Sequence, residues 1–166
     1  MRSTRLQKLT IAGILTAVAV VGSMFSFPFL GSKCAPIQHM VNIICAVFLG
    51  PWYGVAVAFV ASLLRNILGL GTPMAFPGSM FGALLCGLVY AKFPRLFPTC
   101  AAEVFGTAVL GGLAAYPVSV YVMGQSAAFY AFIIPFLIST AVGSVVSWVV
   151  LSAMSHSGVI RRLQQP

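Results

Sequence analysis

The chain has 166 residues, of which 60% are hydrophobic and only 6% are charged, and its mean hydropathy is +1.05. A typical soluble domain carries about 25% charged residues, so this composition excludes a soluble enzyme, a disordered regulator and a nucleic-acid binder. The net charge of +8 comes from nine Lys and Arg residues against a single acid. These basic residues stand at the chain ends and between apolar runs, as the positive-inside rule describes. We therefore expect an integral membrane protein.

The first uncharged stretch predicts one helix over residues 9–29, closed by Phe27-Pro28-Phe29 and Gly31. A spanning helix needs about 20 apolar residues, and this stretch is long enough. No small-residue cleavage site closes it, which favours a span over a signal peptide. Its small residues Gly13 and Ala17 lie on one face, where another helix can pack closely.

The middle of the chain, residues 34–91, holds two or three helices, depending on the role of Gly50-Pro51. Gly-Pro is a strong turn signal, and a second irregular stretch carries Gly69, Gly71 and Pro73. We predict three short helices here, over residues 37–49, 52–68 and 78–92. If Gly50-Pro51 is only a kink, the chain has five helices in total rather than six.

The last uncharged stretch is long enough for two helices, which we place at residues 99–121 and 127–155 with a break between Tyr116 and Gln125. Small residues recur every fourth position in several helices, as close helix packing in lipid requires. These stripes are Gly54, Ala58 and Ser62; Gly78, Gly82 and Cys86; Thr107, Gly111 and Ala115; and Ser139, Gly143 and Ser147. We expect most of these stripes to pack inside the bundle, and one of them to face a partner protein. The first helix, with Gly13 and Ala17, is the best candidate for that role.

Charge favours six helices over five. Basic residues precede the first predicted helix and follow the last one, namely Arg2, Arg5, Lys8, Arg161 and Arg162. Both chain ends therefore belong in the cytoplasm, which requires an even number of spans. Six helices also place Lys92 and Arg95 inside and leave only Lys33 and Arg65 toward the outer face. The fold class we predict is a single all-α transmembrane domain of six helices with both termini cytoplasmic.

With this topology, most hydrogen-bonding side chains gather in the outer third of the membrane. Gln38 and Asn42 lie four residues apart on one face of the second helix, with His39 beside them. Arg65 and Asn66 lie at the outer end of the third helix. Two interpretations remain open: a small-molecule pocket that opens outward, and a membrane interface, where polar and aromatic residues gather anyway.

Glu103 is the only acid in the chain and lies about one turn into the fifth predicted helix from the cytoplasmic side. An ionisable group inside a membrane is expensive and usually paired. We expect a structural ion pair with Lys92, Arg95 or Arg5, or a contact with a partner subunit. This depth predicts no direct role for Glu103 in an outward pocket.

Motifs that energise or catalyse are missing from the sequence. There is no phosphate-binding GxxxxGK[ST] motif, no series of intramembrane acids for proton or sodium coupling, and no catalytic motif that would suggest an enzyme. The four cysteines follow no CxxC or Cys/His pattern, so we expect no disulfide framework, no metal site and no cofactor. Such a chain is able to bind a small molecule but needs partners to move it.

Several segments of the sequence resemble the ThiW family, the thiazole-specific substrate-binding (S) components of energy-coupling-factor (ECF) transporters. These segments cover residues 13–17, 31–42, 49–53, 64–66, 75–80 and 103–107. The resemblance implies a vitamin-precursor importer in a prokaryotic cytoplasmic membrane that captures hydroxyethylthiazole, a thiamine precursor, from outside. It implies a shared transmembrane subunit and two cytoplasmic ATPase subunits as partners, with Gly13 and Ala17 on the docking face.

The ligand implied by the resemblance is neutral, small and aromatic, and it needs a stacking wall and a few hydrogen bonds. Candidate binding residues are the polar and aromatic side chains of the outer third together with one tryptophan of the last helix: Lys33, Gln38, His39, Asn42, Arg65, Asn66, Phe76, Ser79, Tyr116 and Trp148. Cationic thiamine would favour an acid or an aromatic cage, and no carboxylate is expected near this site. Another vitamin, the pyrimidine moiety of thiamine, or a membrane scaffold without ligand remain alternatives.

Overall fold

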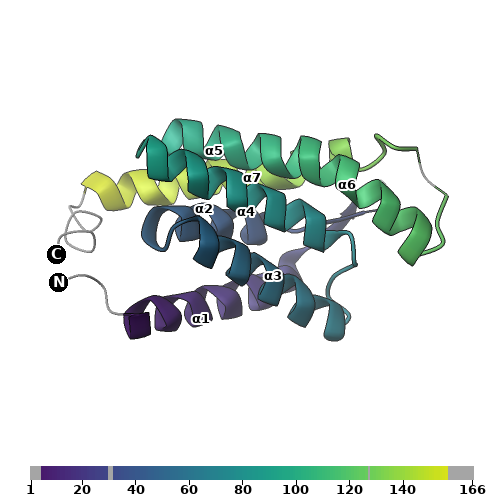
Figure 1. Cartoon of the computed structure of the whole chain (residues 1–166), viewed down its shortest axis with the longest axis horizontal. Coiled ribbons are helices and arrows are strands. Elements are labelled where there is room, and N and C mark those ends of the chain that lie inside the picture. Colours follow the sequence, from purple (N-terminus) through teal and green to yellow (C-terminus); the bar gives the residue numbers. More distant parts are fainter. Residues whose placement is uncertain (1–4, 30–31, 127, 157–166) are drawn as a thin grey trace.

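The computed structural model describes residues 5–29, 32–126 and 128–156, and within these residues the chain forms six helical rods that run side by side (Figure 1). The first rod is α1 (Arg5–Gly22) with the short extension η1 (Ser23–Phe25), followed by α2 (Pro36–Phe48), α3 (Pro51–Ile67) and α4 (Ala75–Lys92). The fifth rod is continuous and combines α5 (Leu96–Phe105), η2 (Gly106–Gly111), α6 (Gly112–Pro117) and η3 (Val118–Val122), and the last is α7 (Ile133–His156).

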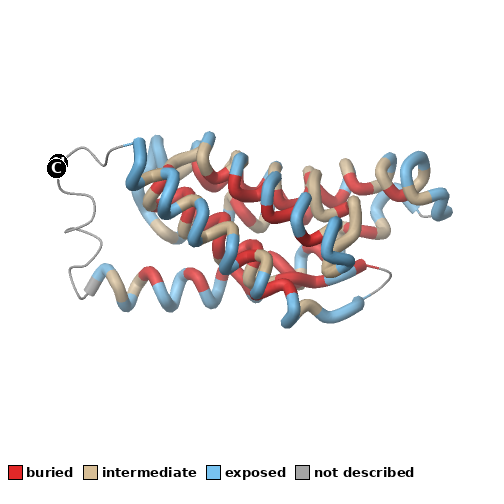
Figure 2. Tube along the Cα trace, turned by 90° about the horizontal axis from the view of Figure 1, so that it is seen from below, coloured by how far each residue is buried: buried red, intermediate tan, exposed pale blue. Residues whose placement is uncertain are grey.

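Four of the described rods are long and apolar enough to cross a membrane: Arg5–Phe25, Ala75–Lys92, Leu96–Val122 and Ile133–Ser155. The helix α2 is apolar but has only 13 residues, and α3 has 17. Figure 2 shows buried residues concentrated where the rods face one another. The exposed residues of the rods include many large apolar side chains, as expected for a protein whose outer surface contacts lipid.

Gly50 separates α2 from α3, which decides between five and six helices. Its φ of 87° lies in the left-handed region that favours glycine, and Pro51 begins α3 with the fixed φ that suits a first helical position. The turn is therefore a break between two helices rather than a kink in one. The start of α1 and the end of α7 lie at the same end of the bundle (Figure 1), while their cytoplasmic placement stays a prediction.

The first helix ends earlier than predicted. Residues Phe27–Phe29 form strand β1, which pairs antiparallel with β2 (Ser32–Cys34), Phe27 opposite Cys34. Pro28 explains the difference, because the residue before a proline is pushed toward extended backbone. The start of the last helix was also predicted wrongly, since α7 begins at Ile133 rather than at residue 127. The first helix begins at Arg5 rather than at residue 9, and the remaining predicted boundaries agree within three residues. Gly31 and the terminal basic residues Arg2, Arg161 and Arg162 lie outside the described residues.

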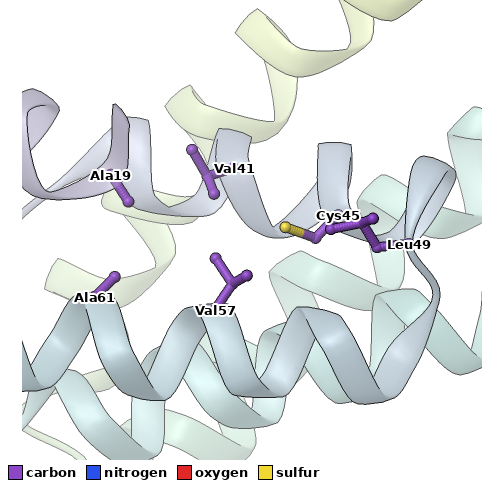
Figure 3. Packing of buried hydrophobic residues seen from close by; sticks show 6 residues of the cluster. All are labelled: Ala19, Val41, Cys45, Leu49, Val57 and Ala61. Carbon is purple, nitrogen blue, oxygen red and sulfur yellow. The ribbon is translucent and has the colours of Figure 1, made fainter. Parts of the chain in front are cut away.

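Small apolar side chains hold the helices together. Between α1, α2 and α3 the core is a cluster of Ala19, Val41, Cys45, Leu49, Val57 and Ala61 (Figure 3). On the other side, α4 and the fifth rod approach so closely that a Cβ on Gly111 would lie 2.6 Å from Cα of Gly78. The predicted role of these stripes in internal packing is confirmed for α4 and the fifth rod. By contrast, Gly13 and Ala17 of α1 are exposed.

Candidate functional site

A small cavity lies at the end of the bundle where α2 and α4 begin, opposite the end where α1 begins. Its volume is about 30 Å³, which gives room for about two water molecules. Its walls come from β2 and the first residues of α2, the end of α3, the first two turns of α4, η2 and α7. The lining residues are Lys33, Ala35, Gln38, His39, Arg65, Ala75, Gly78, Ser79, Thr107, Phe136 and Ser139.

Five of the ten predicted binding residues come together in these walls: Lys33, Gln38, His39, Arg65 and Ser79. They belong to four different elements, so the fold gathers side chains that are far apart in the sequence. Gln38, His39, Arg65 and Ser79 are buried, while Lys33 is exposed at the rim.

The other five predicted residues lie outside the lining. Asn66 donates hydrogen bonds to the carbonyl oxygens of Ser62 (2.8 Å) and Thr72 (3.1 Å), so it closes the loop after α3. Phe76 packs against Phe59 with ring centroids 5.6 Å apart. Trp148 is 49% exposed on α7, and Tyr116 does not reach the cavity either. The fifth, Asn42, is fully buried and binds the carboxylate described next.

Glu103 lies in the protein interior and pairs with His39, which corrects the predicted pairing with Lys92, Arg95 or Arg5. Its side chain is fully buried, and Oε1 lies 3.0 Å from Nδ1 of His39. The same oxygen accepts hydrogen bonds from Asn42 Nδ2 (3.0 Å) and Thr107 Oγ1 (3.1 Å). The expectation that no carboxylate lies near the site is therefore wrong. The misjudged depth has a simple cause: α5 begins at Leu96, which places Glu103 two turns inside the bundle.

A glycine on α4 makes room for this carboxylate. A Cβ on Gly82 would lie 2.7 Å from either Glu103 oxygen and would also collide with Thr107 Oγ1. Glu103 therefore sits against the α4 backbone and is not part of the cavity lining. Among the described residues its Oε2 has no hydrogen-bond partner. Its influence on a ligand must pass through the side chains that it holds, so we regard it as a positioning residue.

Hydrogen bonds connect Glu103 to the cavity wall through the side-chain amides of Asn42 and Gln38, and they fix how these amides are oriented. Asn42 directs its Nδ2 to Glu103 and to the carbonyl oxygen of Ser79 (3.1 Å). Its Oδ1 is therefore free to accept, and it does so from Gln38 Nε2 at 3.2 Å. This order leaves Gln38 Oε1, a buried acceptor on a lining residue, without a partner in the described part of the chain. Such unsatisfied buried groups are rare in native structures and require an explanation.

His39 is oriented in the same way. Because Oε1 of Glu103 already accepts from Asn42 and Thr107, the proton in the third contact belongs on Nδ1 of His39. A neutral imidazole with its proton on Nδ1 has an acceptor at Nε2. No described residue binds that second ring nitrogen, so it remains available at the cavity wall.

Sequence reasoning missed several lining residues. Thr107, Phe136 and Ser139 enter the cavity from η2 and α7, and Phe136 supplies the aromatic wall that was expected from other side chains. Thr107 and Ser139 belong to the small-residue stripes, so their sequence signal was that of helix packing. Among the described residues there is no group of three or more His, Cys, Asp or Glu side chains suited to a metal ion.

Lys33 of β2 and the following Ala35 form one wall of the cavity, and this segment is tied to α7. The backbone nitrogen of Ala35 donates to Ser139 Oγ at 2.8 Å, and Cys34 Sγ contacts the carbonyl oxygen of Pro135 at 3.3 Å. Burial raises the pKa of the Cys34 thiol above its ordinary value. These contacts hold β2 and the residues after it over the site.

Comparison with known proteins gives one finding beyond the geometry. The family model described as "Thiamine-precursor transporter protein (ThiW)" matches residues 9–157, which is most of the chain and includes every lining residue. No curated protein matches the chain.

Proposed function

The chain belongs to the ThiW family of thiamine-precursor transporter proteins, and we propose that it is the capture subunit of an ECF importer that binds hydroxyethylthiazole from outside. It is a multi-pass membrane protein of a transporter family. The coupling to an ECF module and the thiazole specificity are the proposed parts. No catalytic residue and no cofactor enter the proposal.

The observation that carries the proposal is the set of unused hydrogen-bonding atoms on buried lining residues. Gln38 Oε1 has no partner in the described part of the chain, and His39, whose Nε2 has no partner among the described residues, lines the same cavity. Both are acceptors in the arrangement fixed by Glu103, so they suit a ligand that donates from a hydroxyl group. Phe136 offers an apolar aromatic face for the ring of the ligand. Ligand pockets commonly combine apolar walls with a few placed polar groups.

The distribution of charge supports an outward-facing cavity. Lys33 and Arg65 are at the cavity end of the bundle, whereas Arg5, Lys8, Lys92 and Arg95 are at the other end. The positive-inside rule assigns the more basic end to the cytoplasm. Lys33 and Arg65 also disfavour cationic thiamine at the cavity, which replaces the mistaken argument from the absence of a carboxylate.

Titration calorimetry with the purified chain in non-ionic detergent tests the capture role. Hydroxyethylthiazole, thiamine and the hydroxymethylpyrimidine are titrated separately and then as competitors. We expect hydroxyethylthiazole to bind without partner subunits and to be displaced poorly by the other two. Preferred binding of the pyrimidine or of thiamine would reject the thiazole assignment and keep a vitamin-capture role. Failure of all three would reject the proposed function and favour the scaffold alternative.

A further inference from the structure

Arg65 is a buried cation without an acid to pair with. It lies in the last turn of α3, lines the cavity and is 2% exposed. The whole sequence has one acid, Glu103, and among the described residues the one basic side chain that this acid contacts is His39. Arg65 therefore has no carboxylate available within this chain. No hydrogen bond from its guanidinium to another described residue is found, and its buried Nε has no partner.

The backbone fixes Arg65 in this place. Its carbonyl oxygen accepts hydrogen bonds from the nitrogens of Leu70 (2.8 Å) and Gly71 (3.0 Å) as the chain turns at the end of α3. Gly69 adopts a φ of 71° in that turn, which favours glycine. A Cβ on Gly71 would lie 3.2 Å from Cβ of Arg65. The base of the side chain is thus enclosed, and its charged end is left at the cavity wall.

A second cation stands at the same cavity. Lys33 of β2 is exposed, and its Nζ lies 3.4 Å from the carbonyl oxygen of Gly69, in the turn that holds Arg65. An unpaired buried charge is costly, and a charged group at membrane depth usually marks a site of function. The planar guanidinium group suits two-point binding of a carboxylate or phosphate. The cavity is therefore lined by two cationic residues, the exposed Lys33 and the buried Arg65, and by the neutral acceptor of Gln38.

We propose that Arg65 and Lys33 form a subsite for an oxyanion carried by the captured ligand, either a carboxylate or a phosphate. The inference rests on the proposed function and narrows its substrate class: the site binds a thiazole precursor more tightly when the precursor carries an oxyanion for Arg65 beside the hydroxyl group that donates to Gln38 or His39. In this arrangement the oxyanion lies toward Arg65 and Lys33, and the ring lies toward Phe136. The ligand supplies the negative charge that the sequence itself lacks.

Three ligands test the subsite by calorimetry: hydroxyethylthiazole, its phosphate ester, and its derivative with a carboxylate on the ring. We expect at least one anionic form to bind about tenfold or more tightly than the neutral alcohol, because hydrogen bonds between charged groups are the stronger ones. Arg65→Gln should reduce the ratio of the affinity for the anionic form to that for the neutral alcohol to about one, and Lys33→Gln should reduce this ratio less. Arg65→Lys keeps the charge without the planar group and should retain part of the ratio. Arg95→Gln, at the opposite end of the bundle, should leave the ratio unchanged.

The outcomes separate the subsite from the capture role. If the neutral alcohol binds best, or if the ratio survives both Arg65→Gln and Lys33→Gln, the oxyanion subsite is wrong and thiazole capture stands. If no thiazole binds, the proposed function fails and the subsite falls with it. Lys33→Gln alters an exposed residue, so it stays informative should Arg65→Gln fail to fold. Repeating the titrations in nanodiscs with anionic phospholipid tests a lipid headgroup as the source of the anion, because loss of the ratio there would overturn the proposal.

Discussion

Glu103 joins two helical rods through one oxygen atom. His39 and Asn42 reach it from α2, and Thr107 reaches it from η2, one turn further along its own rod. All four side chains are buried. Removing one member of such a group leaves the others without hydrogen-bond partners. In a region of low dielectric constant, an unpaired polar group lowers the stability of the fold most strongly. The cluster therefore serves stability and, through Gln38 and His39, the shape of the cavity.

Substitution of Glu103 separates its acceptor role from its charge. Glu103→Leu should lower the free energy of unfolding by about 3–5 kcal/mol, because His39 and Asn42 lose their buried partner. Glu103→Gln retains a carbonyl oxygen that can accept from Asn42 and Thr107, so it should cost clearly less. Unfolding by SDS in mixed micelles measures both variants. Equal stability of Glu103→Leu and the wild-type chain would contradict the role of Glu103 in holding the two rods together.

Part of the site could be predicted from single residues. Gln38, His39, Arg65 and Ser79 are polar residues in apolar surroundings near predicted helix ends, and the cavity does contain them. Glu103 was misplaced because its depth was measured from a helix start three residues too late, and because the space provided by Gly82 is a property of two packed helices. The aromatic candidates Phe76, Tyr116 and Trp148 lie outside the cavity lining, because sequence position does not tell which face of a helix turns inward.

At the scale of elements, β2 and the residue after it form one wall of the cavity. A cavity of about 30 Å³ is far below the roughly 300 Å³ or more of typical ligand pockets. Capture therefore requires a wall to move. The hairpin is the smallest wall, with two strands of three residues each, and it is held to α7 by the contacts of Cys34 and Ala35.

Alkylation of Cys34 reports this movement. In a variant with the other three cysteines changed to alanine, we expect slow reaction with a maleimide because the Cys34 thiol is buried and its pKa is raised. The rate should increase with pH, since the thiolate is the reactive form and less of it is present below a raised pKa. Bound ligand should slow the reaction further by holding the hairpin closed. A rate equal to that of a free peptide thiol would show that the hairpin does not cover the site.

Close packing between α4 and the fifth rod provides a second prediction. Gly111→Val should destabilise the fold by about 1–3 kcal/mol, because its side chain would meet the backbone of Gly78. The matched control is Gly13→Val, since a Cβ on Gly13 has no neighbour within 4 Å. Thermal unfolding in detergent compares the two variants. Similar losses of stability would contradict the assignment of Gly111 to internal packing and of Gly13 to a free face.

For the whole molecule, we propose that the ECF transmembrane partner docks on the exposed face of α1 that carries Gly13 and Ala17. Both Gly13 and Ala17 are exposed, and small residues allow two helices to approach closely in lipid. Gly13→Trp should therefore abolish copurification with the transmembrane subunit while ligand binding by the isolated chain stays unchanged. Ile11→Trp, exposed on another face of α1, is the control. If both tryptophan variants still copurify with the transmembrane subunit, this face of α1 is not the docking face.

The helical arrangement was more predictable than the site. Gaps between charges, the Gly50-Pro51 turn and the apolar length of each stretch locate the helices because they depend on neighbouring residues and on membrane thickness. The hairpin depends instead on pairing between Phe27–Phe29 and Ser32–Cys34, and the start of α7 has no single strong signal in the sequence. The hairpin and the start of α7 depend on contacts between segments, and these contacts cannot be predicted from the sequence alone.

Calorimetric titration of hydroxyethylthiazole into the wild-type chain, His39→Phe and Trp148→Phe tests the central claim most directly. His39 lines the cavity, whereas Trp148 lies outside it, and size-exclusion profiles confirm that the variants are folded. The account predicts binding to the wild-type chain, a loss of about tenfold or more in His39→Phe, where a buried hydrogen bond disappears, and no change in Trp148→Phe. Wild-type affinity in His39→Phe, or no binding to the wild-type chain at all, would contradict it.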